Sequence, residues 1–598
     1  MVARSKLSVL FICRSNDWPS IFNFLVSESR IYDKCSTYIG CSRNERPMSE
    51  ATDKYGKARA ERKKHVDGIL SSASPKKVVV AGPGTGKTFL FKEVLKGKTN
   101  TLTLTFVRTL VEDLSLELYD LSDVRTLHSY ARNLLTRLWE KKEVNIFADL
   151  SDLIEEDAKL LIGTEVDFTK IFHTRDDGNK NIEFYKARKE YYDDSYGYSD
   201  IIYAAVKYLE VHRDKIPTYE QIVVDEFQDF NPLEVSLVEL LAEKSPILIA
   251  GDDDQALYDF KHASPEHIRH KHGGKSPDYE PFNLPFCSRC PRVIVEAAND
   301  IVESATQAGR LKGRIEKPYV YFEDAQKDLI SQNNPKIIYA QPFAAQIPWF
   351  IEKKIKEIAA EVRAKFSVLI ISPTKVQSQV ITNSLKKKGF QNIDAADKYN
   401  QPPLVSGLKI LAENYKSNLG WRIVAGALMP KEELQKLLKQ TEKKKPKAMH
   451  ELIDANHIAK AKDMVKTLKS LGGEKPMDEP HMQLLREIGI DPYEKIKRVL
   501  MEELTSDSGG VVPAIKKIPI KATTVESSKG LSADYVFITH LDNQYFVKHE
   551  KKKMSMSDRD IFKFLVALTR AKSKVFLISS RKEDPIFLQW IKKERIER

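Results

Sequence analysis

The segment "VVVAGPGTGKTFLFKEVLKG", residues 78–97, constrains the fold more than any other part of the chain. A run of apolar residues ends in a glycine-rich turn, and a helix-forming segment begins directly after it. Such a turn points consecutive backbone N–H groups inward, where they can bind phosphate oxygens. Lys87 would reach the terminal phosphates of a nucleotide, and the Thr88 hydroxyl would ligate Mg²⁺.

The alternative is a strand–helix junction that needs glycine only for its backbone geometry. The coincidence of strand, turn, Lys-Thr pair and helix favours a phosphate loop over this alternative. The predicted nucleotide-binding residues are Gly82, Pro83, Gly84, Thr85, Gly86, Lys87 and Thr88.

A magnesium site also needs a carboxylate at the end of a neighbouring strand, and the segment "QIVVDEFQD" supplies one. Residues 222–224 form an apolar strand, and Asp225 follows at its carboxyl end. We expect Asp225 to bind the metal together with Thr88, and the adjacent Glu226 to orient or deprotonate water. A solvated acidic turn is the alternative for the two acids alone, but their pairing with the phosphate loop favours a metal site.

Short apolar strands alternate with helical segments through most of the chain. The expected strands cover residues 78–81, 102–106, 222–225, 247–251, 336–340, 368–372, 535–539 and 575–579. Strands that alternate with helices form parallel sheets covered on both faces. We therefore predict an α/β protein, and its 598 residues require more than one hydrophobic core.

Two helical insertions interrupt this alternation and define the predicted domains. Residues 1–56 form an N-terminal extension of unknown role, and residues 57–290 form the first α/β domain with an insertion at about 131–218. Residues 291–598 form the second α/β domain with a lysine-rich insertion at about 430–510. Residues 431–470 carry eleven lysines against six acids, so this insertion either guides an anionic partner or presents a solvated face.

The composition indicates the class of partner and the cellular location of the chain. A net charge of +12 suits a polyanionic partner, and no uncharged apolar run is long enough to predict a membrane span. Five cysteines are too few for a disulfide framework, which favours an intracellular protein, cytoplasmic in a prokaryote. The segment "KKKPK" at 443–447 leaves a nuclear location open, and the single CxxC pair, Cys287 and Cys290, lacks the second pair of a zinc ribbon.

Taken in chain order, the motifs resemble those of superfamily 1 helicases of the UvrD/Rep/PcrA type. "AGPGTGKT" resembles their first motif, "LTFVRTLVEDL" resembles TFTNKAAxEM, and "TLHSYARNLL" resembles TFHSFxxxxL. "VVDEFQDFNPLE" is close to VDEFQDTNxxQ, and "IAGDDDQALYDFKHAS" to VGDxDQSIYxFRGA. "LPFCSRCPRVIVEAAN" resembles LxxNYRSxxxIxxAAN, "TTVESSKGLSADYVFI" resembles TxHxSKGLEFDxVFI, and "VALTRAKSKVFLI" is close to VAxTRAKxxLxL. The resemblance covers about 57–300, 335–420 and 520–580, and the order of its motifs is highly specific.

The resemblance implies two RecA-like domains that hold ATP and Mg²⁺ in the cleft between them. Its catalytic residues would be Lys87, Glu226, Gln255, Arg289 and Arg570. Gln255 would sense the γ-phosphate, while the two arginines would stabilise the charge on the transferred phosphoryl group. Gln228 and Asp229 would lie beside the metal site.

The resemblance also implies a track for single-stranded DNA. Phe106, Tyr258 and Phe260 would serve as base platforms, because stacking on a ring tolerates every base. Core packing is the alternative for an isolated phenylalanine. The remaining nucleic-acid contacts, to backbone or sugar, would come from His128, Lys261 and Thr524.

Four positions depart from the family pattern. The segment "ARAERKKHVDGIL" lacks the glutamine that would read adenine, and Ser288 replaces the tyrosine that would stack on it. Glu526 replaces a histidine and Ser532 replaces a glutamate near the DNA. These departures leave open which nucleoside triphosphate the site accepts.

Two functions follow from this pattern. The first is an ATP-dependent helicase or translocase that moves 3′ to 5′ on single-stranded DNA and acts at DNA junctions. The second is a nucleotide-gated DNA-binding subunit that recruits an unidentified protein partner without unwinding. RNA as the preferred track is a weaker third hypothesis.

Overall fold

The computed structural model describes residues 48–598 except 107, 141–143, 274–277, 363, 396–402, 443–446, 471–516, 547, 551–552 and 582. Apart from the first turns of helix α2, the elements and sites described lie in the compact unit Tyr55–Arg598. Three predictions fall wholly or partly outside the described residues: the N-terminal extension with Cys13, Cys35 and Cys41, most of the KKKPK segment, and the end of the lysine-rich insertion. None of the described helices is long and apolar enough to cross a membrane.

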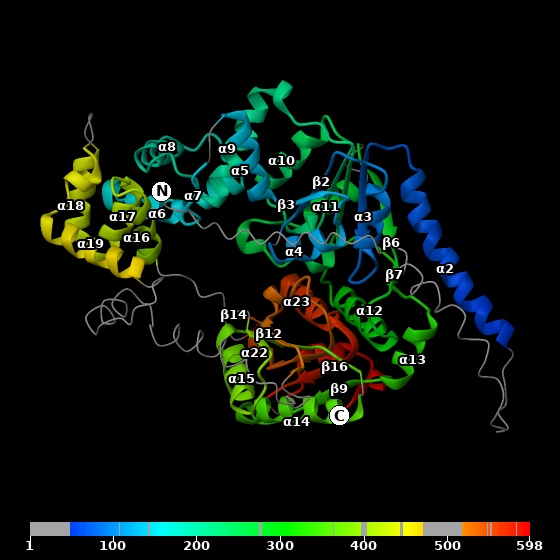
Figure 1. The fold of residues 1–598 in the computed structure, drawn as a ribbon. Coiled ribbons are helices and arrows are strands. Elements are labelled where there is room, and N and C mark those ends of the chain that lie inside the picture. Colours follow the sequence, from blue (N-terminus) through cyan, green and yellow to red (C-terminus); the bar gives the residue numbers. More distant parts are fainter. Residues whose placement is uncertain are drawn as a thin grey trace, which may run out of the picture. The chain divides into compact units, whose positions relative to one another are not determined.

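Two parallel β-sheets form the framework, as Figure 1 shows. The first has the strand order β3-β2-β4-β5-β1-β6. Its strands are β1 (Lys76–Ala81), β2 (Thr101–Thr105), β3 (Asp123–Thr126), β4 (Gln221–Val224), β5 (Ile247–Gly251) and β6 (Glu280–Leu284). All of its strand pairs are parallel, so the carboxyl ends of β1, β5 and β4 lie at the same edge. Ligands of parallel α/β sheets bind at this edge.

Helices cover both faces of the first sheet. They are α2 (Met48–Ser71), α3 (Lys87–Leu95), α4 (Arg108–Glu117), α10 (Pro232–Ala242) and α11 (Glu266–His272). Successive residues of a strand point to opposite faces. Accordingly, Val78 and Val80 pack against α10 and α11, whereas Val79 and Ala81 pack against α2, α3 and α4.

The second sheet has the order β11-β12-β10-β13-β16-β9-β17 and is also wholly parallel. Its strands are β9 (Ile337–Ala340), β10 (Val368–Ser372), β11 (Ile393–Ala395), β12 (Ile520–Thr524), β13 (Ala533–Ile538), β16 (Ala571–Ile578) and β17 (Ile596–Glu597). Its helices are α12 (Arg292–Gln307), α13 (Ala325–Asn333), α14 (Ile347–Glu361), α15 (Lys375–Lys387), α22 (Asn543–Phe546), α23 (Asp558–Leu568) and α24 (Ile586–Trp590). Leu369 and Ile371 face α12, α23 and α24, while Val368 and Ile370 face α14 and α15.

The predicted α/β class with parallel sheets is confirmed, and each of the eight expected strands forms. The sequence pattern missed β3, β6, β11, β12 and β17. These strands are short or carry polar residues, as in "IKATT" of β12, so they lack the apolar run on which the prediction depends. Two two-stranded sheets complete the strands described, β7 (Phe286–Cys287) with β8 (Val320–Tyr321) and β14 (Lys548–Glu550) with β15 (Lys553–Ser555).

Helices also fill the two insertions. The first contains α5 (Leu127–Leu138), α6 (Leu150–Ile162), α7 (Phe168–His173), α8 (Ile182–Tyr191) and α9 (Tyr198–Val211). The second contains α16 (Pro403–Glu413), α17 (Asn418–Leu428), α18 (Lys431–Thr441) and α19 (Ala455–Ser470), so its helices begin before residue 430. The insertions share one apolar core and a buried ion cluster, in which Asp157 contacts Arg422 at 2.7 Å and Arg188 at 2.9 Å.

Candidate nucleotide-binding site

The phosphate loop joins β1 to α3 and is closely covered by other parts of the chain. Gly86 begins the helix with φ 99°, a conformation that glycine adopts without strain. A Cβ atom on Gly84 would lie 2.4 Å from the Cβ of Arg289, and one on Gly82 would lie 2.8 Å from the ring of Tyr319. Both contacts exclude a side chain, so close packing requires glycine at both positions, and at Gly84 the positive φ of 71° requires it as well.

Lys87 and the two predicted acids lie together at the carboxyl edge of the sheet. The Nζ of Lys87 is 2.7 Å from Oε1 of Glu226 and 3.4 Å from Oδ1 of Asp225. Burial alone would lower the pKa of Lys87, but the two carboxylates raise it above its ordinary value. Burial also favours the neutral form of Glu226, yet Lys87 and Lys529 outweigh it and lower the pKa of that carboxyl. Lys87 and Glu226 therefore favour their charged forms and neutralise one another, whereas burial raises the pKa of Asp225.

Backbone strain supports a functional role for Glu226. Its φ is 54°, a left-handed value that is uncommon for residues other than glycine. Strained residues of this kind persist only where the surrounding structure holds them, and they cluster at active sites. The donor set also fits Mg²⁺: Asp225 and the hydroxyl of Thr88 supply oxygen ligands, which this cation prefers.

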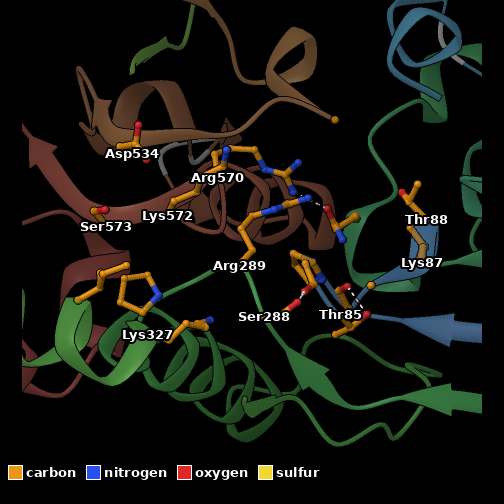
Figure 2. A pocket seen from close by; sticks show the side chains of 18 of the residues that line it. Thr85, Lys87, Thr88, Ser288, Arg289, Lys327, Asp534, Arg570, Lys572 and Ser573 are labelled. Atoms are coloured by element: carbon orange, nitrogen blue, oxygen red, sulfur yellow. Dashed lines mark hydrogen bonds between the residues drawn. The ribbon is translucent and has the colours of Figure 1, made fainter. Parts of the chain in front are cut away.

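Arg289 and Arg570 enter the same pocket from the side of the second sheet (Figure 2). The pocket has a volume of about 530 Å³, and its lining includes the whole phosphate loop, Glu226 and Gln255. Arg570 is buried, and it donates to Oε1 of Gln255 and to the carbonyl of Val566, each at 2.8 Å. Burial, with repulsion from Arg289, lowers its pKa to about 10. Among the described residues neither arginine forms an ion pair.

A chain of hydrogen bonds links Lys87 to Arg570. The amide of Gln228 donates to Oε2 of Glu226 at 2.6 Å, and its carbonyl oxygen accepts from the backbone N–H of Asp252 at 3.0 Å. The carboxylate of Asp252 in turn accepts from the Nε2 of Gln255 at 2.6 Å. Gln255 thereby holds its other side-chain atom, Oε1, toward Arg570.

Lys529 is a residue of the site to which sequence reasoning assigned no role. It follows η9 (Glu526–Ser528) after β12, and its Nζ is ion-paired with Asp229. The same Nζ donates to the backbone carbonyl of Gln255 at 2.6 Å and lies 3.5 Å from Oε2 of Glu226. Its side chain is only 2% exposed, so it connects the two sheets inside the protein. The motif "SKGL" contained this lysine and was the available signal.

Three consecutive aspartates, Asp252, Asp253 and Asp254, directly precede Gln255, and their carboxylates lie close together. Lys317 lies against all three carboxylates, at 2.9 Å from Asp252 and from Asp254. Arg269 also pairs with Asp253 at 3.0 Å and Arg314 with Asp254 at 2.9 Å, so cations of the chain itself neutralise these acids and fix the turn that presents Gln255.

Three aromatic residues predicted as base platforms come together. The ring of Tyr258 lies 5.0 Å from Phe106 and 5.9 Å from Phe260, and Lys261 lies 5.0 Å from the ring of Phe106. Phe260 is 58% exposed, so core packing does not account for it. Phe106 and Tyr258 are half-buried and pack against the two hydrophobic cores. The exposed edge of this cluster suits stacking by a base.

The remaining predicted nucleic-acid contacts are Thr524 and His128. The hydroxyl of Tyr258 donates to the carbonyl of Glu526 at 3.3 Å, which brings the cluster to the turn that follows Thr524. The hydroxyl of Thr524 accepts from the backbone N–H of Ser527 and so caps this turn. Burial, with Lys261 nearby, lowers the pKa of His128 to about 4. His128 is therefore neutral at pH 7 and adds no charge for phosphate binding.

Comparison with known proteins matches two parts of the chain to one family. The UvrD/REP helicase N-terminal domain matches residues 167–273, and the UvrD-like helicase C-terminal domain matches residues 428–582. DNA helicase II of Escherichia coli is 34% identical over 97 residues, which are 16% of this chain and 13% of that protein. ATP-dependent DNA helicase PcrA of Staphylococcus aureus is 31% identical over 103 residues, 17% of this chain and 13% of that protein.

A longer match at lower identity is to the probable DNA helicase II homolog of Mycoplasma genitalium. It is 23% identical over 387 residues, which are 60% of this chain and 54% of the relative. The chain thus spans about half of this relative and much less of the other two. The chain is therefore similar to the UvrD/REP helicase family over both of these matched segments, the N-terminal domain type preceding the C-terminal one.

Proposed function

We propose that this protein hydrolyses ATP in the pocket between its two sheets and uses the cycle to move along single-stranded DNA and unwind duplexes. Travel from 3′ to 5′ and action at DNA junctions are part of the proposal and come from the family resemblance. The names of the relatives, DNA helicase II and ATP-dependent DNA helicase PcrA, support the same activity.

The excess positive charge of the pocket carries this proposal. Five cationic side chains line it, namely Lys87, Arg289, Lys327, Arg570 and Lys572, against the carboxylates of Glu226 and Asp534. A buried guanidinium without a carboxylate is costly, and a polyphosphate would supply the missing negative charge. A purely structural role would instead favour an acidic partner for each arginine.

Each residue near the phosphates has a proposed task. The backbone of the phosphate loop and Lys87 would hold the β- and γ-phosphates, and Thr88 with Asp225 would hold Mg²⁺. The cation, when bound, would neutralise charge on the phosphate oxygens. Lys87 would then exchange its contact with Glu226 for phosphate, which frees Glu226 to orient the attacking water.

Coupling to DNA would run through Gln255 and Lys529. The side chain of Gln255 accepts from Arg570, and its backbone carbonyl accepts from Lys529. A shift of Gln255 on loss of the γ-phosphate would therefore move groups that belong to both sheets. Lys529 lies 5.7 Å from the ring of Tyr258, in the aromatic cluster proposed to stack bases. Closure and opening of the pocket would therefore shift the platforms relative to one another.

The second hypothesis, a nucleotide-gated subunit that recruits a protein partner without unwinding, has one observation in its favour. Glu526 introduces a carboxylate next to the aromatic cluster, where it pairs with Lys563 at 2.9 Å. An acid at this position neutralises a cation that could otherwise bind phosphate and would weaken the grip on DNA.

A strand-displacement assay distinguishes the two hypotheses. Duplexes with a 3′ or a 5′ single-stranded tail are incubated with the protein, Mg²⁺ and each of the four nucleoside triphosphates. We expect displacement with the 3′ tail and ATP, and we expect Lys87→Ala to abolish both displacement and nucleotide hydrolysis. Hydrolysis without displacement would establish the gated subunit, whereas hydrolysis retained by Lys87→Ala would refute the assignment of the phosphate loop.

A further inference from the structure

The proposed mechanism leaves one motif unused, the CxxC pair of Cys287 and Cys290. Cys287 ends β7 and Cys290 precedes α12, and both side chains are fully buried. The backbone N–H of Cys290 donates to the Sγ of Cys287 at 3.4 Å, so the two cysteines close a tight turn. Among the described residues they belong to no group of side chains arranged to hold a metal ion.

The turn between the two cysteines packs against the phosphate loop. The N–H of Ser288 donates to the carbonyl of Gly84 at 2.9 Å, and its hydroxyl donates to the same oxygen at 3.2 Å. Arg289 comes from this turn and packs with its Cβ against Gly84. Any change in the turn therefore moves both the cover of the phosphate loop and one of the two arginines of the pocket.

The sulfur atoms have partners of their own at the same site. The Sγ of Cys290 donates to the carbonyl of Thr569 at 3.4 Å, and Thr569 directly precedes Arg570. The hydroxyl of Tyr319 lies 3.3 Å from the Sγ of Cys287 and 3.0 Å from the carbonyl of Pro83 in the phosphate loop. The two thiols thus contact the supports of both arginines and of the loop.

The surroundings favour ionisation of one thiol. Burial alone would raise the pKa of Cys287, but hydrogen bonds from Cys290 and Tyr319 outweigh it and lower this pKa below its ordinary value. Lys327 adds positive charge and clamps the turn by donating to the carbonyls of Cys287 and Cys290. A thiolate beside a thiol three residues away is the arrangement in which thiol–disulfide exchange proceeds once the oxidant reaches the thiolate, and because both side chains are buried the turn must open locally for this reaction.

We propose that Cys287 and Cys290 form a thiol–disulfide pair, and that its oxidation by a small-molecule disulfide switches off the nucleotide site. The thiolate of Cys287 attacks the oxidant, RSSR, and releases one thiol, RSH, as the mixed disulfide forms. The thiol of Cys290 then loses its proton and displaces the second RSH, so two thiols are oxidised and one disulfide is reduced to two thiols. The new bond removes the hydrogen bond from Cys290 to Thr569 and displaces Arg289 and its neighbours.

The effect on hydrolysis rests on the proposed function, whereas disulfide formation does not. A displacement of catalytic groups by about 1 Å costs on the order of 100-fold in rate. We expect oxidised protein to lose hydrolysis by about this factor and to recover it with dithiothreitol.

The test uses the full chain with Cys13, Cys35 and Cys41 replaced by serine, so that only the CxxC pair remains. This protein is treated with oxidised glutathione under native conditions, and peptide mapping by mass spectrometry measures the Cys287–Cys290 disulfide. Nucleotide hydrolysis is measured before oxidation, after it and after reduction. The matched control is Cys287→Ser, which removes the attacking thiolate and keeps the hydrogen bond from Cys290 to Thr569.

The outcomes separate this proposal from the proposed function. The expected result is formation of the disulfide with reversible loss of hydrolysis, and a Cys287→Ser variant whose hydrolysis does not change on oxidation. A pair that stays reduced, or a disulfide that forms without changing hydrolysis, overturns the switch. If the reduced protein does not hydrolyse nucleotide at all, the proposed function fails, while disulfide formation still reports on the thiol pair.

Discussion

Replacing Arg570 by methionine should separate catalysis from stability. Methionine keeps an unbranched apolar stem and removes the guanidinium, which lacks a carboxylate partner among the described residues. The fall in the pKa of Arg570 from 12.5 to about 10 corresponds to a penalty of about 3 kcal/mol against its charged form. The substitution removes this penalty.

The same substitution also removes two short hydrogen bonds, to Gln255 and to the carbonyl of Val566, and two longer ones, to the carbonyl of Leu531 and the hydroxyl of Thr569. Hydrogen bonds from a charged group contribute about 1.5–3 kcal/mol each, so their loss offsets or slightly exceeds the relief. We therefore expect the free energy of unfolding to fall by no more than about 3 kcal/mol. Hydrolysis should fall by about 10³-fold or more, because an arginine on the transferred phosphoryl group contributes that much to the rate.

Arg422→Met is the matched control, since Arg422 is equally buried but is paired with acids. It contacts Asp157 at 2.7 Å and Glu156 at 2.9 Å, in the shared core of the two insertions. Removing one partner of a buried ion pair costs about 3–5 kcal/mol, and because Asp157 keeps Arg188 at 2.9 Å we expect the lower end of this range for Arg422→Met. We expect this variant to be the less stable of the two and to retain basal hydrolysis.

Differential scanning calorimetry and phosphate release with saturating single-stranded DNA measure the two quantities. The reasoning predicts opposite rankings: Arg422→Met melts lower, and Arg570→Met turns over more slowly. If Arg570→Met hydrolysed ATP within tenfold of the unmodified protein, or melted below Arg422→Met, Arg570 would be a structural residue and the charge argument would be wrong.

Three further substitutions test other parts of the site. Phe260→Ala should reduce DNA-stimulated hydrolysis more than basal hydrolysis. The control Trp349→Ala, which removes a similarly exposed ring, should change neither rate. Equal loss of both rates in Phe260→Ala would argue against a base platform. Gly84→Ala should abolish nucleotide binding measured by calorimetry, because the new Cβ would clash with Arg289. Gly97 has a similar positive φ but open space around it, so Gly97→Ala should cost only about 1–2 kcal/mol of stability. Burial raises the pKa of Glu234 to about 7, so ionisation of this carboxyl destabilises the folded state increasingly from about pH 4.5 to 7. Glu234→Gln should therefore stabilise the protein by about 3 kcal/mol at pH 8 and by little at pH 4. A stability gain that does not depend on pH would contradict this explanation.

Local signals were sufficient for the phosphate loop and the main strands. The apolar run of β1, the glycines after it and the Lys-Thr pair act within one short segment, so neighbouring residues determine the conformation. The same holds for Asp225 and Glu226, which follow directly from the end of β4. Motif order then indicated Arg289 and Arg570 through the family resemblance.

Contacts between residues far apart in the sequence were missed for a physical reason. Lys529 and Asp229 form a buried ion pair although they lie 300 residues apart, and nothing near either residue specifies the other. Tyr319 donates to the carbonyl of Pro83 from 236 positions away and carries no motif. Such pairs depend on how the two sheets pack, which no window of the sequence contains.

The sequence by itself determined the strand–turn–helix unit, the two acids and the alternation that makes parallel sheets, because each depends on adjacent residues and on simple periodicity. Only the tertiary structure decided which of the 96 basic residues meet in one pocket, and that Arg570 is paired with none of the described acids while Arg422 is paired with two. Electrostatic environment is set by distance and burial in space, and chain folding brings together charges that the sequence keeps hundreds of residues apart.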